Sequence, residues 1–245
     1  MFENSDREWE TYGAENPYFG VLSNARFLKE NLTDEARLVF WQSGQNDIET
    51  VFKNIRQHID PEFQPRRALD FGCGVGRLLF PIAERCEHAT GVDVSPSMLA
   101  EAKTQAAIKA IDNLSFIESS DCRELGENTF CFVHSYIVFQ HIPEAKGYAI
   151  LDRLLASLRS GGIGVLHFTF SSKNFWYWKI IRNVPFNKQL RNLLQGKPLS
   201  TPRMQMNEYD LNFIMKKLWS HGASNCYVEF SDHGVVGVTL YFKKA

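Results

Sequence analysis

The sequence predicts a doubly wound α/β fold around a mostly parallel sheet. Between about residues 65 and 170, short apolar strands alternate with helical patterns, and this alternation is typical of parallel strands joined by right-handed crossovers. Three glycines within five residues, Gly72, Gly74 and Gly76, join the first of these strands to a helix. Near the end, only Asp232-His233-Gly234 separates two further strands. Such a short connection predicts a C-terminal antiparallel β-hairpin.

The region before the sheet is expected to be helical. Thr33 and Asp34 have the residue types of a helix start, and Ser43-Gly44 is expected to interrupt or end that helix. Five apolar residues then follow at the spacing of an amphipathic helix: Ile48, Val51, Phe52, Ile55 and Ile59. We therefore predict an N-terminal helical lid or extension over residues 1–62 and one domain over 63–245, with an insert at 171–208.

The elements of the main domain follow from their local patterns. Strands are expected at about 66–71, 88–93, 114–119, 130–136, 162–170, 226–231 and 235–242. Helices are expected at 76–86, after Ser95 as N-cap with Pro96 at the first position, and at 143–158. A last helix is expected after Asn207, with Leu211, Ile214, Met215, Leu218 and Trp219 on one face and Gly222 at its end.

Composition and charge narrow the class of protein. Five scattered cysteines without a CxxC pair are typical of reduced thiols in a cytoplasm. No apolar run is long enough to span a bilayer, and MFENSDREWE is neither a signal nor a transit peptide. The net charge of −1 argues against a nucleic-acid partner. Residues 171–208 hold seven basic residues and only Glu208 as an acid, which favours an anionic acceptor over contact with a membrane surface.

Two carboxylates indicate which cofactor the glycine turn binds. Asp93 ends the next strand 21 positions after Gly72, where a carboxylate suits two ribose hydroxyls. Asp70, just before the glycines, would repel a pyrophosphate and attract an ammonium group. The spacing is GxGxG rather than GxGxxG, and no GKS or GKT follows. These features favour a ligand with an adenosine and a positively charged amino-acid end.

The segments LDFGCGVGRL, GVDVSPSMLAEA and VHSYIVFQHIP resemble the motifs of the class I S-adenosylmethionine (SAM)-dependent methyltransferases over about residues 65–170. The resemblance implies a Rossmann-like, seven-stranded sheet, with SAM as cofactor and S-adenosylhomocysteine (SAH) as product. It implies that the methionine part of SAM is held by Asp70 and by the turn of Gly72, Cys73, Gly74 and Gly76, with His134 and Ser135 at the methionine amine. It implies that Asp93 binds the ribose and that Val94 and Met98 flank the adenine. Asp121 and Cys122 would lie beside the adenine amino group. Asp121 as a helix N-cap is the equal alternative. Many relatives have an aspartate where this chain has Cys131.

A proton acceptor is expected near the carboxyl ends of the fourth and fifth strands. His134, His141 and His167 lie there by sequence. We select His141 and His134 as candidate catalytic bases, although His141 has the alternative of orienting its loop or capping the next helix. His167 lies within an apolar strand and is expected to be a core histidine. The sequence shows no carboxylate cluster for a metal at the strand ends.

The sequence thus favours a SAM-dependent methyltransferase acting on a small molecule or carbohydrate, at oxygen. The alternative is a SAM- or SAH-binding module without transferase activity, serving as a sensor or scaffold subunit. Methylation of nucleic acid is disfavoured by the charge. The aromatic and basic insert is expected either to cap the acceptor or to pack as a helical pair on the sheet edge.

Overall fold

A seven-stranded sheet forms the centre of the molecule, with strand order β3-β2-β1-β4-β5-β7-β6. The structure is a computed structural model that describes residues 5–171, 204–232 and 235–245. The strands are β1 (Arg67–Phe71), β2 (His88–Asp93), β3 (Leu114–Glu118), β4 (Phe130–Ser135), β5 (Leu158–Ser171), β6 (Ala223–Asp232) and β7 (Val236–Lys244). Strands β1 to β5 pair in parallel, and β7 runs antiparallel to both β5 and β6. The predicted parallel sheet with a closing hairpin is confirmed.

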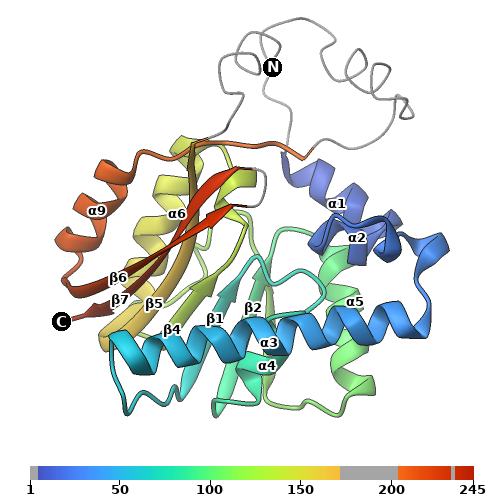
Figure 1. Ribbon diagram of the computed structural model, residues 1–245, viewed down its shortest axis with the longest axis horizontal. Coiled ribbons are helices and arrows are strands. Elements are labelled where there is room, and N and C mark those ends of the chain that lie inside the picture. The colour runs from blue at the N-terminus through green and yellow to red at the C-terminus, as the bar shows by residue number, and fades with distance from the viewer. Residues whose placement is uncertain (1–4, 172–203, 233–234) are drawn as a thin grey trace, which may run out of the picture.

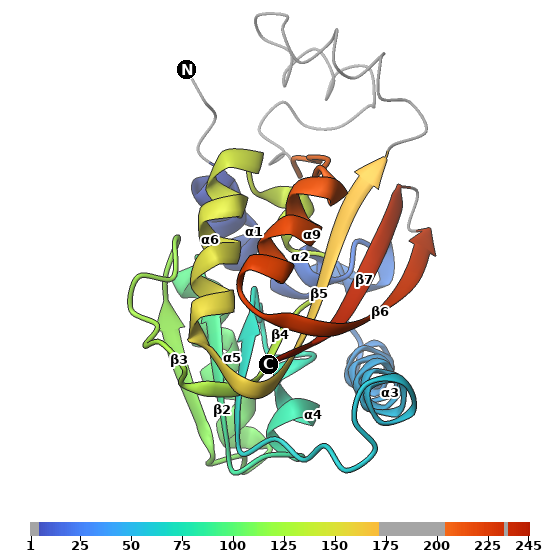
Figure 2. The ribbon, with the colours of Figure 1, turned by 90° about the vertical axis from the view of Figure 1, so that its left-hand side faces the viewer.

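Helices cover both faces of this sheet (Figures 1 and 2). On one face lie α3 (Asp34–His58), α4 (Leu79–Ala83) and α5 (Pro96–Ile108), and on the other lie α6 (Glu144–Ser157) and α9 (Leu211–Ser220). Each face has its own apolar core. Buried residues such as Ile48 and Leu79 fill the first, and Leu151, Leu154 and Ile214 fill the second. Apolar burial on both faces is what a parallel sheet requires.

The N-terminal helices lie beside α5 at the top of the sheet in Figure 1. They are α1 (Ser5–Glu15) and α2 (Pro17–Val21), followed by the 3₁₀ turns η1 (Ala25–Phe27) and η2 (Lys29–Asn31). Tyr12 and Tyr18 of these helices share an apolar cluster with Phe40 of α3, Val75 of the glycine turn and Met98 of α5. The N-terminal segment is therefore packed against the elements that carry the predicted cofactor residues.

Helix α3 runs unbroken from Asp34 to His58, so the expected interruption at Ser43-Gly44 is wrong. Thr33 caps it as predicted, because its hydroxyl accepts the N–H of Ala36 at 3.2 Å. The glycine serves close packing instead. A Cβ at position 44 would lie 2.1 Å from the backbone oxygen of Arg77. Only a residue without a side chain lets the helix approach that backbone.

Two expectations for α9 also need correction. Its N-cap is Asp210, whose carboxylate accepts the N–H of Asn212 at 2.9 Å. Asn207 lies before the helix and instead donates its side-chain N–H to the carbonyl of Gln140 at 3.1 Å. Trp219 is 79% exposed and so does not share the buried face that Ile214 and Leu218 form. The buried stripe of this helix is narrower than the sequence pattern suggested.

Candidate functional site

The glycine turn after β1 has a backbone that only glycine adopts freely. Gly72, Gly74 and Gly76 have φ angles of 74°, 53° and 93°, which L side chains rarely adopt. The N–H groups of Gly72 and Cys73 donate to the carbonyl of Val92 at 2.7 and 3.0 Å. This pair of hydrogen bonds fixes the turn against the end of β2. The turn is also closely packed, because a Cβ at Gly72, Gly74 or Gly76 would lie 2.3, 2.7 or 2.4 Å from the nearest atom of another side chain.

Asp93, at the end of β2, lies between this turn and α5. Its Oδ2 accepts the N–H of Gly74 at 2.8 Å, and its Oδ1 accepts the N–H of Ser95 at 2.9 Å. Burial of the carboxyl raises its pKa to about 6, despite these hydrogen bonds. Each carboxylate oxygen has a second lone pair. Asp93 is therefore equipped to accept two ligand hydroxyls as well.

Asp70 and His134 form a buried pair at the carboxyl ends of β1 and β4. The two residues are direct partners in the parallel register, and His134 Nδ1 lies 2.8 Å from Asp70 Oδ1. Both side chains are almost fully buried. Next to them, the hydroxyl of Ser135 donates to the carbonyl of Phe71 at 3.0 Å. His134 and Ser135 thus hold the carboxyl end of β1 directly before the glycine turn.

Beyond β3, Asp121 is held by arginines. Its carboxylate pairs with Arg123 Nε at 2.7 Å and with Arg153 Nη1 at 3.2 Å. The N-cap alternative is wrong, because residues 119–129, all within the described chain, form turns and no helix. The buried Cys122 has a φ of 62° and donates its N–H to Ser119 Oγ at 2.8 Å. These contacts place a fixed turn beside the end of β2.

The four strand ends form one continuous edge in the order β3, β2, β1, β4. Three inter-strand spacings of about 4.8 Å give an edge of about 14 Å. Along it, Asp121-Cys122 comes first, then Asp93-Val94, then the glycine turn with Asp70, and last His134-Ser135. The sheet brings every predicted cofactor segment to this edge, and Met98 joins it from the first turn of α5. An extended ligand with a nucleoside at one end and an amino acid at the other fits this order of groups.

His141 lies in the 3₁₀ turn η3 (Phe139–His141), after β4. Its Nδ1 lies 2.7 Å from the carbonyl oxygen of Gln205, and its Nε2 lies 3.2 Å from the amide nitrogen of Gln140. The ring of Trp9 packs edge-on against it, 4.8 Å between centroids. Burial lowers the pKa of His141 to about 4, so the imidazole is neutral near pH 7. It makes no cap for α6, which has no side-chain cap hydrogen bond.

The contacts of His167 and Cys131 give these two residues structural roles. His167 is buried in β5, and its Nε2 lies 2.9 Å from the hydroxyl of Ser231. Cys131 lies at the start of β4, away from the candidate edge. Its sulfur accepts the N–H groups of Arg66 and Arg67 at 3.0 and 3.1 Å, so it holds the start of β1. Among the described residues, no group of three His, Cys, Asp or Glu side chains is arranged to hold a metal ion.

The segment after β5 is anchored beside His141. Most of the expected insert, including its aromatic residues, lies outside the described part of the chain. After it, the N–H of Asn207 donates to the carbonyl of Gln140 at 2.7 Å. The carbonyl oxygen of Gln205 is the group that lies 2.7 Å from His141 Nδ1. The N–H of Tyr209 then donates to the carbonyl of Thr169 at 2.8 Å. Both ends of the segment therefore meet at the top of β5.

Sequence reasoning missed several residues of this region. Glu10 of α1 accepts hydrogen bonds from Ser95 and Ser97, directly after Asp93. No spacing in the acidic N-terminal stretch indicates this contact. The partner of Asp70 was also missed, although aligning β1 with β4 in parallel register would have placed His134 beside it.

Comparison with known proteins shows what this arrangement resembles. Residues 68–162 match the family model of the methyltransferase domain. A 23S rRNA (uracil(1939)-C(5))-methyltransferase of Shewanella amazonensis is 44% identical over 62 residues, which cover 25% of this chain and 13% of that protein. The aklanonic acid methyltransferase of a Streptomyces species is 41% identical over 102 residues, covering 39% of this chain and 44% of that protein. The chain thus spans less than half the length of these relatives.

A solved structure agrees over the whole chain. Magnesium protoporphyrin IX methyltransferase of Synechocystis with bound SAM superposes with a TM-score of 0.64 and 17% identity. The match covers 100% of this chain and 99% of that one. At this identity the likeness concerns the fold. Within the described residues, the structure has no helix of the length and hydrophobicity needed to cross a membrane.

Proposed function

We propose that this chain, whose residues 68–162 match the methyltransferase domain, is a class I SAM-dependent methyltransferase that transfers a methyl group from SAM to an acceptor and releases SAH. The observation that carries this proposal is the edge formed by β3, β2, β1 and β4. On that edge, the Asp93 carboxylate and the glycine turn lie side by side, joined by the hydrogen bond from Gly74.

The residues of the edge fit the cofactor that the sequence predicts. Asp93 would accept the two ribose hydroxyls, with Val94 and Met98 beside the adenine. Asp70 would hold the ammonium of the methionine end through its second oxygen, since His134 occupies the first. When bound, SAM supplies an electrophilic methyl group on a sulfonium. The protein's own task is then to align the acceptor and, for a hydroxyl, to remove a proton.

Of the two candidate bases, His134 has the better arrangement for accepting that proton. Its Nδ1 faces Asp70, so the carboxylate favours the tautomer with the proton on Nδ1 and fixes the orientation of the ring. That leaves Nε2 as the proton acceptor. His141 has both ring nitrogens engaged and a pKa of about 4, which makes it a weak base near pH 7. We assign His141 the role of holding the end of the insert through Gln205.

The anchoring of the insert supports a role for residues 171–208 as a cap over the acceptor. Gln205 and Asn207 hydrogen-bond with the turn that carries His141, and that turn follows β4 at the candidate edge. The N-terminal residues 1–62 would form the second cover, since Trp9 reaches the same histidine from α1. Residues 63–245 then form the catalytic domain.

All five cysteines are free thiols, which suits the reducing cytoplasm.

The exclusion of nucleic acid as a partner is wrong. Besides the protein of Shewanella amazonensis, relatives from Shewanella sediminis and a Marinomonas species are 23S rRNA methyltransferases. The argument from net charge failed because it averaged over the chain. The seven basic residues between 171 and 208 are a local cationic segment within a chain of net charge −1, and a local segment is sufficient for contact with phosphates.

Titration calorimetry with SAM and SAH tests the cofactor, and absence of binding to the folded protein would exclude it. Transfer is tested with methyl-labelled SAM and separate acceptor pools: rRNA fragments, small metabolites and carbohydrates. The pool that becomes labelled identifies the class of acceptor. Mass spectrometry of a labelled small molecule then shows whether the methyl group is on oxygen, as the sequence favoured. Binding without transfer to any pool would support the alternative of a SAM- or SAH-binding module.

A further inference from the structure

Glu10 of helix α1 is bound to the first turn of α5. Its carboxylate accepts the Ser95 hydroxyl at 2.7 Å, the Ser97 hydroxyl at 2.5 Å and the Ser97 N–H at 3.2 Å. Burial would raise the pKa of Glu10, but the hydrogen bonds from Ser97 and Ser95 outweigh it and leave the pKa below its usual value. The side chain is therefore held as a carboxylate, and three donors converge on it.

The same contact leads directly to Asp93. Ser95 donates its hydroxyl to Glu10 and its backbone N–H to Asp93 Oδ1 at 2.9 Å. Its hydroxyl oxygen also accepts the N–H of Met98 at 3.1 Å, which caps α5. One residue thus connects the N-terminal helix, the proposed ribose carboxylate and the helix that carries Met98. Displacing Glu10 would free the Ser95 side chain that fixes this turn.

Helix α1 is attached at both ends of the candidate edge. At the α6 side, Asp6 pairs with Lys146 Nζ at 2.9 Å. At the α5 side, Glu10 accepts from Ser95 and Ser97. The next helix, α2, is attached there too, because the Tyr18 hydroxyl donates to Glu101 at 2.7 Å and accepts from Arg37 at 3.1 Å. The first helix therefore reaches across the edge from the far side of β4 to α5.

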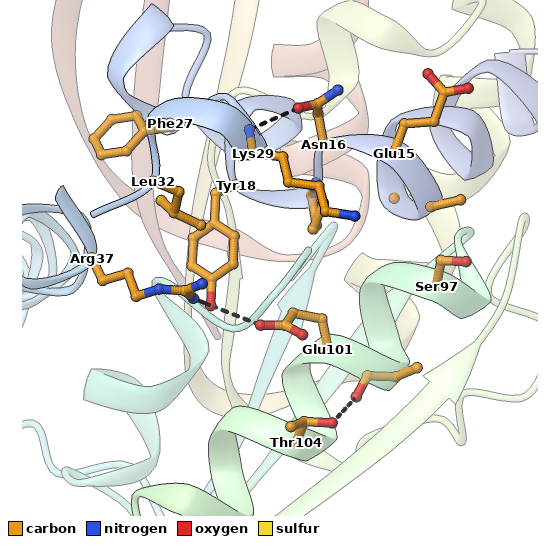
Figure 3. Close-up of a pocket in the computed structure, with 14 residues that line it drawn as sticks. Glu15, Asn16, Tyr18, Phe27, Lys29, Leu32, Arg37, Ser97, Glu101 and Thr104 are labelled. Atoms are coloured by element: carbon orange, nitrogen blue, oxygen red, sulfur yellow. Dashed lines mark hydrogen bonds between the residues drawn. The ribbon is translucent and has the colours of Figure 1, made fainter. Parts of the chain in front are cut away.

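Beside the contact between Tyr18 and Glu101, a cavity lies beneath the connection between α1 and α2. Figure 3 shows Tyr18 and Glu101 at its base, with Asn16, Lys29 and Ser97 around it. The cavity measures about 520 Å³. It contains none of the glycine turn, Asp70 or Asp93, so it is separate from the candidate edge. Beside this cavity, α1 meets the start of α5 through Glu10, through Tyr12 in the cluster with Met98, and through Gly13, where a Cβ would lie 2.3 Å from the Ser95 hydroxyl.

We propose that Glu10 is a positioning residue that fastens helix α1 over the bound cofactor and fixes the Asp93–Ser97 turn on which the cofactor rests. This inference rests on the proposed function. Its hydrogen bonds run to Ser95 and Ser97, so Glu10 acts through these two residues. The expected consequence is kinetic, because a fastened helix slows the release of SAM and SAH.

The test measures the dissociation rate of labelled SAH from the full chain, chased with unlabelled SAH. Glu10→Ala and Ser97→Ala should each raise this rate by about 10-fold or more, since each removes hydrogen bonds to a charged group. Ser97→Thr keeps a hydroxyl and should restore a rate near that of the wild type. Glu35→Gln, an exposed change in the first turn of α3, is the matched control and should leave the rate unchanged.

The double variant Glu10→Ala/Ser97→Ala separates this role from general destabilisation. If the two residues act through one contact, the double variant dissociates SAH no faster than the faster single variant. Two outcomes would overturn the proposal. In one, the fold-increases of the two single variants multiply in the double variant. In the other, the single variants release SAH at the rate of the control. A merely structural role would lower the melting temperature of the variants and leave their SAH dissociation rate at the wild-type value.

Hydrogen exchange keeps the proposal testable if the wild type binds neither SAM nor SAH. That result would refute the proposed function but leave the contact of Glu10 to be judged in the free protein. Amides of residues 5–15 should then exchange at least several-fold faster in Glu10→Ala and Ser97→Ala than in Glu35→Gln. Equal exchange in all three variants would show that Glu10 does not fasten α1.

Discussion

His134 Nδ1 lies 2.8 Å from Asp70 Oδ1, and the two residues are register partners on neighbouring parallel strands. Both side chains are buried at the point where β1 passes into the glycine turn. Neither group is satisfied without the other, because removing the imidazole would leave a buried carboxylate short of a donor.

We expect His134→Ala to weaken SAH binding by about 10-fold, as the loss of a hydrogen bond to a buried charged group costs about 1–3 kcal/mol. His134→Asn keeps a side-chain N–H near the position of Nδ1 and should bind SAH almost as well as the wild type. If His134 is also the base, the asparagine variant will bind SAH but transfer methyl groups slowly. Calorimetry and a labelled-transfer assay measure the two effects, and equal SAH affinity in both variants would contradict the positioning role.

SAM affinity should rise with pH around 6. Burial raises the pKa of Asp93 to about 6 in the folded protein, from 3.8, and only the carboxylate accepts both ribose hydroxyls. Affinity should therefore increase between about pH 5 and 7 and level off above. Asp93→Asn should bind weakly with a flat profile over the same range. Calorimetry from pH 5 to 8 gives both curves, and a falling affinity over this range would contradict the assignment.

The stability of the unliganded protein should change in the opposite direction. A carboxyl whose pKa is raised on folding contributes stability that is present below pH 3.8 and is lost as the pH rises through about 6. Asp93→Asn removes that contribution. Between pH 5 and 7, the melting temperature of this variant should fall less, relative to its value at pH 5, than that of the wild type. Parallel curves for the two proteins would contradict the raised pKa.

Gly44→Ala should destabilise the fold. In an exposed helix this change would stabilise by about 1 kcal/mol, but here the new Cβ would lie 2.1 Å from the backbone oxygen of Arg77. Because that oxygen belongs to the main chain, α3 must move, at a cost of about 1–3 kcal/mol. Urea unfolding measures the loss. Glu49→Ala, on the exposed side of the same helix, should leave stability within about 0.5 kcal/mol.

The buried cysteines should be unreactive in the folded protein. Burial raises the pKa of the Cys73 thiol well above its usual value and that of Cys122 to about 12, so neither forms the nucleophilic thiolate near neutral pH. Maleimide labelling at pH 7.5 followed by mass spectrometry should modify the half-buried Cys86 and Cys226 before the buried cysteines. Cys73→Ala should keep methyl transfer. Rapid native labelling of Cys73 would contradict this prediction.

Local signals in the sequence were sufficient for much of the fold. Ser95-Pro96 starts α5 because the cap and the first helical position depend only on adjacent residues. The C-terminal strands pair antiparallel because three residues cannot support a crossover. The glycine turn and Asp93 were placed correctly on one edge, since parallel strands end on the same side.

Features that depend on distant segments were not predictable. Gly44 reads as a helix breaker until the backbone of Arg77 is placed against it. Asn207 has the residue type of a cap, yet it hydrogen-bonds with Gln140, 67 residues away in the chain. Glu10 is one of several acids in a polar stretch, and its role arises only when α1 meets α5. Each outcome depends on tertiary contacts that no local pattern contains.

The hydrogen bond between Tyr209 and Thr169 closes a loop of 39 intervening residues at its base. The free energy of closing such a loop grows only slowly with its length, by about 0.6 kcal/mol for each doubling. Evolution can therefore lengthen, shorten or replace this loop at small cost to the sheet beneath it. Proteins that share this architecture can diverge in this one segment, while the strands of the proposed cofactor edge stay unchanged.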